Sequence, residues 1–131
     1  MTDSGTRAEA AFTVDSWEEA PYDEPGQGPR LTRVTVRKTY AGRIDGTGVA
    51  EVLTSQGDAG SGYVASERVV GTLDGRAGTF VVQHGGLAHP DGTLSTFGSI
   101  VPGSGTGGLG GLSGTAGEGA RGVLTLDYRL G

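Results

Sequence analysis

The residues best suited to proton transfer in this sequence are a carboxylate and an imidazole, Glu67 and His84. They lie on either side of Asp74-Gly75, a dipeptide that favours a two-residue type I′ hairpin. If Leu73 pairs with Arg76 across that turn, the two groups become diagonal neighbours on one face of the hairpin. Burial raises the pKa of a carboxyl group, and a histidine beside it suits general acid–base catalysis near neutral pH.

The hairpin face that carries Glu67 is the more apolar and aromatic of the two, so we assign it to the interior. Tyr63 lies two residues away on that face and completes a predicted catalytic trio. Phe80 and Val82 share the face, and they are predicted to contact an apolar substrate together with Tyr128. The alternatives are a structural ion pair, or an inverted assignment in which both acid–base groups point to water.

A second, weaker polar set follows from a hairpin predicted at Tyr40-Ala41-Gly42-Arg43. One face of this hairpin is expected to carry Val34, Val36, Lys38, Tyr40, Val49, Glu51 and Leu53. Tyr40 and Glu51 are therefore predicted to line the substrate site. Trp17 is predicted to cover the mouth of that site, although a lone tryptophan that pins a loop is the common alternative.

No cofactor and no metal are predicted. The sequence contains no cysteine, and a metal site around its two histidines would have to recruit Glu67 or Asp91 without the usual ligand spacing. The segment GSGTGG at residues 103–108 matches the spacing of a dinucleotide-binding loop, but the surrounding glycines prevent the helix that such a loop requires. We expect these glycines to let the chain bend or pack its backbone closely.

Charge and composition exclude several classes of partner. Ten Lys and Arg against fifteen Asp and Glu give a net charge of −5, which disfavours nucleic acid and anionic membranes. No apolar stretch approaches the length of a membrane span, and the N-terminus lacks the apolar core of an export signal. We therefore predict a cytoplasmic protein that binds a small molecule.

Glycine spacing predicts the fold class. The chain of 131 residues contains 27 glycines, which interrupt any regular helix after Gly42, so we predict one all-β domain over residues 8–131. Residues 1–7 are predicted to be a disordered tail, and the acidic segment at about residues 18–29 a long loop. The predicted strands are Glu9–Ser16, Leu31–Tyr40, Arg43–Thr54, Tyr63–Leu73, Arg76–Leu87, Thr93–Val101, a glycine-dense stretch near Gly107–Thr115, and Arg121–Leu130.

Eight strands with few bulky side chains predict an eight-stranded antiparallel β-barrel, because closing the sheet removes its exposed edges. A barrel of this size is filled by side chains or holds one small ligand. The chain has three Phe, four Tyr and one Trp to fill it, so we expect a cavity.

Several segments also resemble a known family, the bacterial domain of unknown function 3224. They are FTVDSWEEAPYDE, LTRVTVRKTYAGRIDGTGVAEVL, SERVVGTLDGRAGTFVVQHGG, VPGSGTGGLGGLSG and GVLTLDYRL. The resemblance implies an allene oxide cyclase-like barrel whose glycine-rich strand is similar to that of dirigent proteins. Family members tend to carry a bulky aromatic residue near Gly98, so Phe97 followed by Gly98 implies an enlarged interior with Phe97 in its lining.

The family has no established reaction, but its structural relatives imply ring closure or coupling of unsaturated molecules without a cofactor. We therefore expect a cofactor-independent cyclase or isomerase that holds a largely apolar, unsaturated substrate in the barrel. The alternatives are a non-catalytic carrier or dirigent-like protein, and a structural protein with a plugged interior. The resemblance also implies a homo-oligomer, for which the outward residues Ser66, Thr79, Val81 and Gln83 offer a flat sheet surface.

Overall fold

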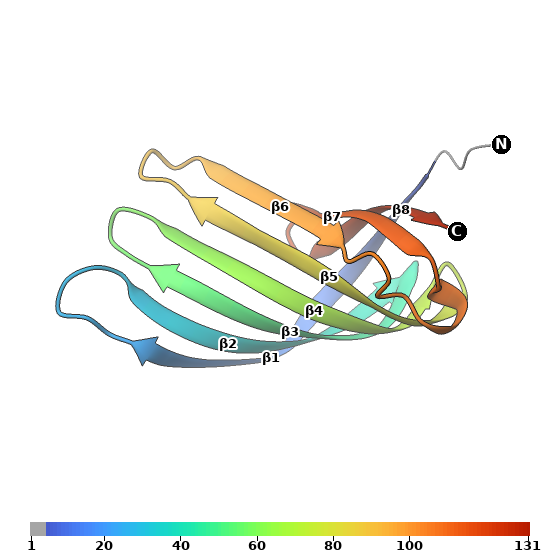
Figure 1. The fold of residues 1–131 in the computed structure, drawn as a ribbon, viewed down its shortest axis with the longest axis horizontal. Coiled ribbons are helices and arrows are strands. Elements are labelled where there is room, and N and C mark those ends of the chain that lie inside the picture. The colour runs from blue at the N-terminus through green and yellow to red at the C-terminus, as the bar shows by residue number, and fades with distance from the viewer. Residues whose placement is uncertain (1–4) are drawn as a thin grey trace.

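The computed structural model describes residues 5–131 as one ring-like sheet of eight antiparallel strands (Figure 1). Each strand pairs with the next along the chain, and β8 returns to β1. The strands are β1 (Thr6–Asp23), β2 (Arg30–Gly42), β3 (Ile44–Gln56), β4 (Ser61–Leu73), β5 (Arg76–Ala88), β6 (Leu94–Ile100), β7 (Leu112–Ala120) and β8 (Val123–Leu130), with a short 3-10 helix at Gly107–Leu109. The predicted all-β chain of eight antiparallel strands is confirmed.

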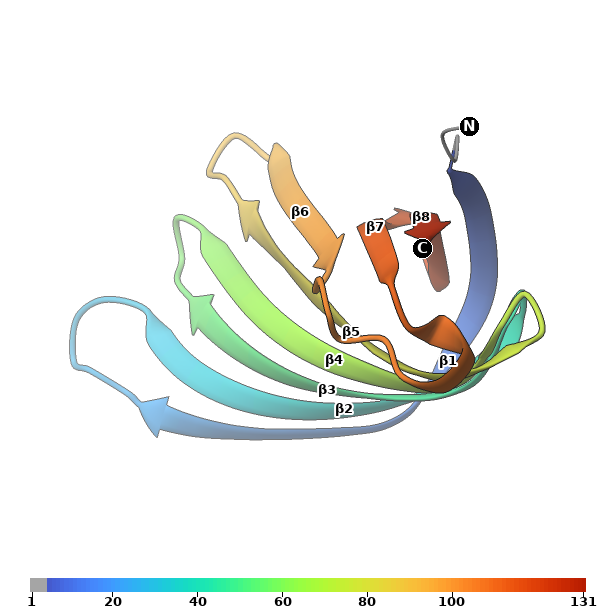
Figure 2. The ribbon, with the colours of Figure 1, turned by 45° about the vertical axis from the view of Figure 1, so that its right-hand side comes forward.

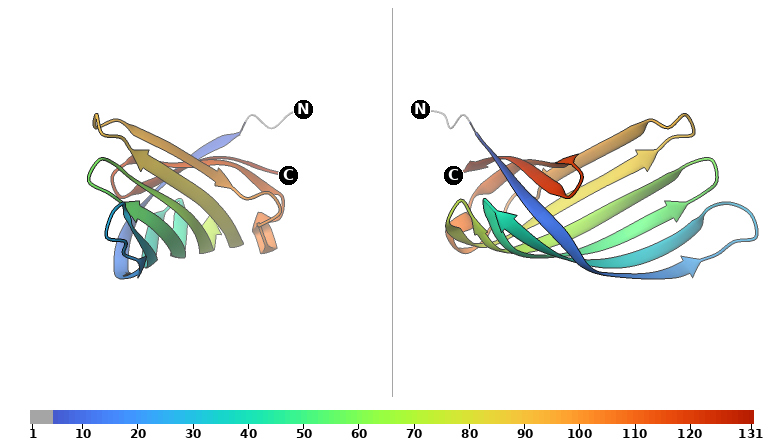
Figure 3. Two further views of the ribbon diagram at one scale, coloured as in Figure 1. Left: turned by 60° about the vertical axis from the view of Figure 1, so that its left-hand side comes forward. Right: turned by 180° about the vertical axis from the view of Figure 1, so that it is seen from behind.

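The ring is continuous at one end of the molecule only. β1 pairs with β8 through residues 6–11, and within the described residues β6 pairs with β7 only at Ser99 and Ile100. Residues 13–23 of β1 and 94–97 of β6 are thus the two margins of a curved sheet that projects from the ring (Figure 2). We call the ring the closed half and the projecting sheet the open half; β1 runs diagonally through both (Figure 3).

The closed half is filled by large apolar side chains. Its buried core includes Tyr40, Ile44, Val69, Leu73, Phe80, Val82, Ile100, Leu109, Leu112 and Leu126. Leu109 comes from the short 3-10 helix between β6 and β7, so this connection contributes to the core as well as linking two strands. The closed half is therefore a packed core.

The glycine-rich segment before that helix runs along β5 as a continuation of β6. The amide of Val101 donates to the carbonyl of Val81, and that of Thr106 donates to Thr79, both at 2.9 Å. A Cβ atom on Gly78 would lie 2.0 Å from the carbonyl oxygen of Thr106. The expectation that this segment packs its backbone against a neighbour is confirmed.

A row of glycines crosses β3, β4 and β5. Gly46 pairs with Gly71, and Gly71 pairs with Gly78. A Cβ atom on Gly71 would lie 2.1 Å from the carbonyl oxygen of Asp45, and one on Gly46 would lie 2.1 Å from that of Val70. Because only glycine permits this approach, the row allows the sheet to curl into a ring.

The hairpin between β4 and β5 has the predicted register. Asp74 and Gly75 have φ values of 50° and 83°, as a type I′ turn requires. Leu73 pairs with Arg76, and Ala65 pairs with His84. The predicted placement of Glu67 and His84 on one face follows from this register and is confirmed.

The predicted register of the β2–β3 hairpin is wrong. Tyr40 pairs with Gly46, three residues beyond the expected partner Arg43. A shift by an odd number of residues turns every side chain of a strand to the opposite face. Glu51 and Leu53 therefore point outward, and Val52 points inward beside Val34.

Two predictions about the N-terminal region also change. Residues 1–4 of the predicted tail lie outside the described residues, whereas Thr6 and Arg7 already belong to β1. The segment predicted as an acidic loop is strand as far as Asp23, which leaves residues 24–29 as the connection. Pairing with β2 holds this segment extended, and Pro21 is tolerated because it lies on a strand at a sheet margin.

Among the described residues, no helix has the length and apolarity to cross a membrane.

Candidate functional site

The centre of the candidate site is the carboxylate of Glu67, which points from β4 into the interior and is 3% exposed. The ammonium group of Lys38 lies 2.9 Å from Glu67 Oε1, and the hydroxyl of Tyr40 donates to Oε2. Gly48 makes room for this group, because a Cβ atom there would lie 2.3 Å from Oε2. The buried carboxylate is thus held by a cation and a phenol, in a space that a glycine leaves open.

The surroundings of Glu67 keep it ionised. Burial alone would raise its pKa, but the nearby imidazole of His84, the charge of Lys38 and hydrogen bonds from Tyr40 and Lys38 together lower it. The expected upward shift is therefore wrong. It follows from the burial of Glu67 alone and leaves out Lys38 and Tyr40, its two partners on β2.

His84 connects Glu67 to the solvent boundary. Its Nε2 atom lies 3.8 Å from Glu67 Oε1, and its Nδ1 atom lies 3.3 Å from the hydroxyl of Tyr63. The His84 side chain is 24% exposed, and Tyr63 is 38% exposed. Glu67, His84 and Tyr63 therefore form a polar chain from the interior to the surface. The structure brings the predicted trio together.

Tyr63 is placed to act as a neutral donor at the outer end of this chain. Burial, and then the negative charge of Glu118, raise the pKa of Tyr63. Its ring packs on Gly86, where a Cβ atom would lie 3.1 Å from the ring, and meets the His84 ring edge-on at 5.6 Å. The hydroxyl is thereby held next to the imidazole.

The second predicted polar set is divided by the structure. Lys38 and Tyr40 join the Glu67 cluster, and Phe12 lies beneath the Lys38 ammonium group at 4.6 Å from the ring centroid. Sequence reasoning missed the roles of Phe12 and Gly48. The signal that would have revealed Gly48 is the β2–β3 register, which places it opposite Lys38.

Trp17 lies on the margin of the open half as an exposed side chain. It pairs with the inward residue Val36, and its indole Nε1 donates to Glu19 at 3.1 Å. Glu19 also accepts from Thr32 and Gln56. These bonds, first that from Trp17 and then those from Gln56 and Thr32, lower the pKa of Glu19. Trp17 is thus held beside the open half.

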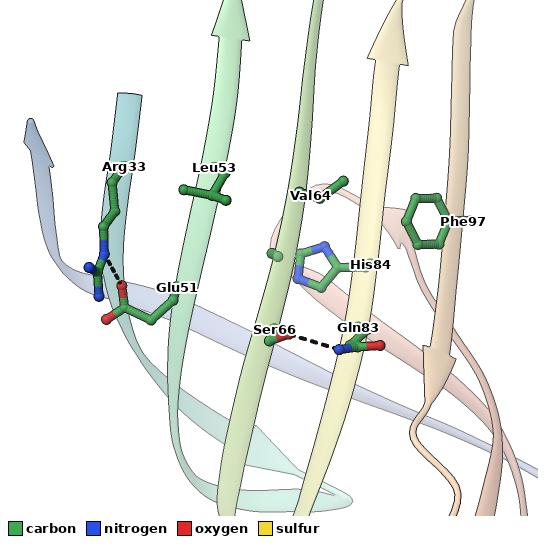
Figure 4. Close-up of a pocket in the computed structure, with 9 residues that line it drawn as sticks. Arg33, Glu51, Leu53, Val64, Ser66, Gln83, His84 and Phe97 are labelled. Atoms are coloured by element: carbon green, nitrogen blue, oxygen red, sulfur yellow. Dashed lines mark hydrogen bonds and ion pairs between the residues drawn. The ribbon is translucent and has the colours of Figure 1, made fainter. Parts of the chain in front are cut away.

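Two predicted lining residues, Glu51 and Phe97, lie on the outside of the sheet. Glu51 accepts from Arg33 at 3.1 Å and from Thr35 at 3.0 Å. Both residues line a hollow of about 540 Å³ together with Leu53, Val64, Ser66, Gln83 and His84. Figure 4 shows these side chains. For these two residues, the expected interior lining is wrong. Glu51 follows the shifted β2–β3 register, and Phe97 lies opposite Gly85 on the outer face of β5.

Three other predicted substrate contacts lie in the closed half. Phe80 and Val82 are buried in its core, and the hydroxyl of Tyr128 donates to Asp74 at the β4–β5 turn. These side chains therefore belong to the packing of the closed half. Gly98 does not enlarge the interior as expected, because a Cβ atom there would lie 2.1 Å from the carbonyl oxygen of Ala116 on β7.

Within residues 5–131, no group of three or more His, Cys, Asp or Glu side chains is arranged to hold a metal ion. The groups at the site that can take part in chemistry are an ionised carboxylate, an imidazole and a phenol.

Comparisons with known proteins agree on one family. The model for a protein of unknown function, DUF3224, matches residues 8–130. A crystal structure of a protein with unknown function from the DUF3224 family of Shewanella oneidensis MR-1 is 30% identical, with a TM-score of 0.81 over 98% of each chain. No curated protein matches the chain.

Proposed function

The chain belongs to the DUF3224 family, and from that premise we propose that it is a cofactor-independent isomerase or cyclase acting on a largely apolar, unsaturated small molecule. Because the family has no known reaction, the proposal depends on the residues of the site. The observation that carries it is the polar chain of Glu67, His84 and Tyr63. A carboxylate ionised in the interior contacts an imidazole that itself reaches a phenol at the surface.

The surroundings of this chain favour a neutral ligand. Lys38, the cation beside the site, is already paired with Glu67, so it is not free to bind an anionic group. Trp17 and Tyr63 offer exposed aromatic surface on the open half. The inward side chains between them form a small aliphatic cluster of Val34, Val36, Ala50, Val52 and Ala65. An apolar molecule with one carbonyl group suits this combination.

The geometry supports a proton shift next to such a carbonyl group. With its ring proton on Nε2, facing Glu67, His84 accepts the Tyr63 hydroxyl at Nδ1. When that hydroxyl turns to the substrate carbonyl oxygen, Nδ1 becomes available to accept a proton from a carbon adjacent to the carbonyl. The neutral hydroxyl of Tyr63 donates a hydrogen bond to the enolate oxygen that forms. His84 then returns the proton at a different carbon, so the double bond moves and no oxidant or reductant is needed. Glu67 stabilises the transient imidazolium.

The proposal includes the finer fold assignment. The ring-like sheet, in which every strand pairs with the next, is compatible with the allene oxide cyclase-like barrel that the sequence resemblance implies. The ligand would enter from the open half, because the closed half is filled by the core.

A non-conjugated enone, 3-cyclohexen-1-one, tests the proposed proton shift, because its conversion to the conjugated isomer is followed by ultraviolet absorbance. We expect the wild type to catalyse this conversion. His84→Ala should lower kcat/KM by about 100-fold, within the usual contribution of a general base. Tyr63→Phe should also lower it by about 100-fold, the lower end of the usual effect of removing one donor to an oxyanion. The matched control is Tyr22→Phe, which changes an exposed tyrosine on β1.

Turnover that survives His84→Ala would remove the acid–base assignment. If the wild type shows no turnover but retains a small molecule through purification, as detected by mass spectrometry, the carrier alternative replaces the enzyme proposal. Affinity for that molecule should then be unaffected by Glu67→Gln.

A further inference from the structure

The open half has a strand margin that lacks the usual protection against pairing. Within the described chain, β6 pairs along its whole length with β5, but with β7 only at Ser99 and Ile100. Gly98 lies against the backbone of Ala116 on β7, so residues 94–97 have a neighbouring strand on one side only. Their sequence, LSTF, contains no charged residue and no proline, whereas exposed sheet edges are normally protected by charges, proline or bulges.

The other margin of the same sheet carries all three kinds of protection. Residues 13–23 of β1 include Asp15, Glu18, Glu19, Asp23 and Pro21. They also contain two register irregularities, between Val14 and Ser16 and between Pro21 and Asp23. The contrast shows that β6 is the margin open to pairing.

The backbone of β6 presents unused hydrogen-bonding groups at this margin. The β4–β5 hairpin closes on the pair Leu73–Arg76, so alternate residues of β5 bond to β4 and the others bond toward β6. The amide of Val101 donates to Val81 on that second side, which fixes the alternation. Ser95 pairs with Leu87, and Phe97 pairs with Gly85. The backbone N–H and C=O groups of Ser95 and Phe97 therefore point toward β5. The N–H and C=O groups of Leu94 and Thr96 point away from the sheet.

Exposed apolar side chains accompany these groups on both faces. Leu94 is 73% exposed on the inward face, and Phe97 is 58% exposed on the outward face. The Phe97 ring covers Gly85, where a Cβ atom would lie 2.5 Å from it. Leu87 of β5 adds a further exposed apolar side chain on the outward face. An incoming strand would bury apolar surface as well as pair the backbone.

We propose that β6 pairs with β6 of a second copy of this chain, so that two open halves join into one continuous sheet. A twofold axis brings the same strand of each copy together, and two copies of one strand related by that axis run antiparallel. Because residues 94–97 carry no charge, like-to-like pairing involves no repulsion. A corresponding β1–β1 contact would oppose Asp15, Glu18 and Glu19 to their own copies.

Light scattering and sedimentation velocity of the full chain, from about 1 to about 200 µM, test this dimer. We expect the mass to approach twice the 13.2 kDa of one chain as concentration rises. Thr96→Pro removes an amide that points away from β5 and should leave the β5–β6 ladder intact. Thr96→Lys places a charge at the same margin. Both variants should be monomeric, with circular dichroism showing that they remain folded.

Two matched controls locate the interface. Val14→Lys places the same charge at the β1 margin, and Val64→Lys places it on the outward face of β4, away from both margins; neither should change the dimer. A wild type that stays monomeric across the range overturns the proposal. So does dissociation by Val64→Lys while both Thr96 variants remain dimeric, since that result assigns the contact to the sheet face.

Discussion

At the scale of single residues, the Glu67 cluster is unusual because a buried ion pair of this kind adds little net stability to a fold. Removing a carboxylate and an ammonium group from water costs several kcal/mol per ion, and well-packed apolar replacements are often as stable. Glu67 and Lys38 are nevertheless both held inside, with Tyr40 and His84 as further partners. Such a cluster is better explained by proton chemistry than by folding stability, which is why it carries the proposed function.

The lowered pKa of Glu67 predicts how its contribution depends on pH. Because the folded-state pKa lies below the ordinary value of 4.5, the ionised group stabilises the fold above about pH 4.5 and loses this effect as pH falls through the folded pKa. Glu67→Gln should therefore destabilise the protein by about 3 kcal/mol at pH 7, as expected when a buried pair loses one partner. The loss should be smaller near pH 3. Urea unfolding of both proteins at the two pH values measures this difference.

Comparison of wild type with variant cancels the contributions of Asp74 and Glu19, whose pKa values hydrogen bonds also lower. An equal destabilisation by Glu67→Gln at both pH values would contradict the assignment of an ionised, paired Glu67.

At the scale of elements, glycines decide where the strands bend and how closely they approach. The row of Gly46, Gly71 and Gly78 crosses three strands, and the backbone of a neighbour occupies the place of each missing side chain. The hairpin at Asp74 and Gly75 sets the register that brings Glu67 and His84 together. Positions without side chains thus shape the ring, while one turn aligns the site.

Gly71→Ala should destabilise the protein by about 2 kcal/mol or more, the usual cost of overpacking. The new Cβ atom would lie 2.1 Å from the carbonyl oxygen of Asp45, and neither backbone can move without disturbing the β3–β4 ladder. The matched control is Gly117→Ala in β7, where no atom lies within 4 Å of the added Cβ. Urea midpoints measure both changes, and equal midpoints for the two variants would show that the bend does not depend on the glycine row.

At the scale of the whole molecule, the fold combines a packed ring with a projecting sheet. The closed half holds the large apolar side chains and supports the site from below. The open half exposes Trp17, Tyr63 and the β6 margin, so the proposed ligand surface and the proposed dimer contact belong to the same part of the molecule. Site and proposed interface are connected through β5, which carries His84 and pairs with β6.

The narrow contact between β6 and β7 predicts where the ring opens first. Two residue pairs join these strands, whereas β3 and β4 pair along their full length. Native-state hydrogen exchange should therefore show faster exchange for amides of β7 than for those of β4, because local opening follows the least-supported ladder. Equal protection of the two strands would show that the ring opens as one unit.

The sequence was informative where a local signal sets the geometry. Asp74-Gly75 predicts its turn and register because both positions need positive φ, and the glycine-rich stretch near residue 105 predicts close backbone packing. The weaker Ala41-Gly42 signal led to the wrong register, and one odd shift moved Glu51 to the outside. Phe97 was assigned to the interior from a family tendency, and only its pairing partner Gly85 shows its true face.

By itself, the sequence determined the fold class, the number of strands, the main hairpin and the meeting of Glu67 with His84 and Tyr63, since these follow from turn chemistry and alternation along neighbouring strands. Tertiary structure alone decided that Lys38 and Tyr40 reach the same carboxylate and lower its pKa. It also decided that the ring is filled at one end and open at the other. Those features depend on register and curvature across strands distant in the chain, which local sequence patterns do not encode.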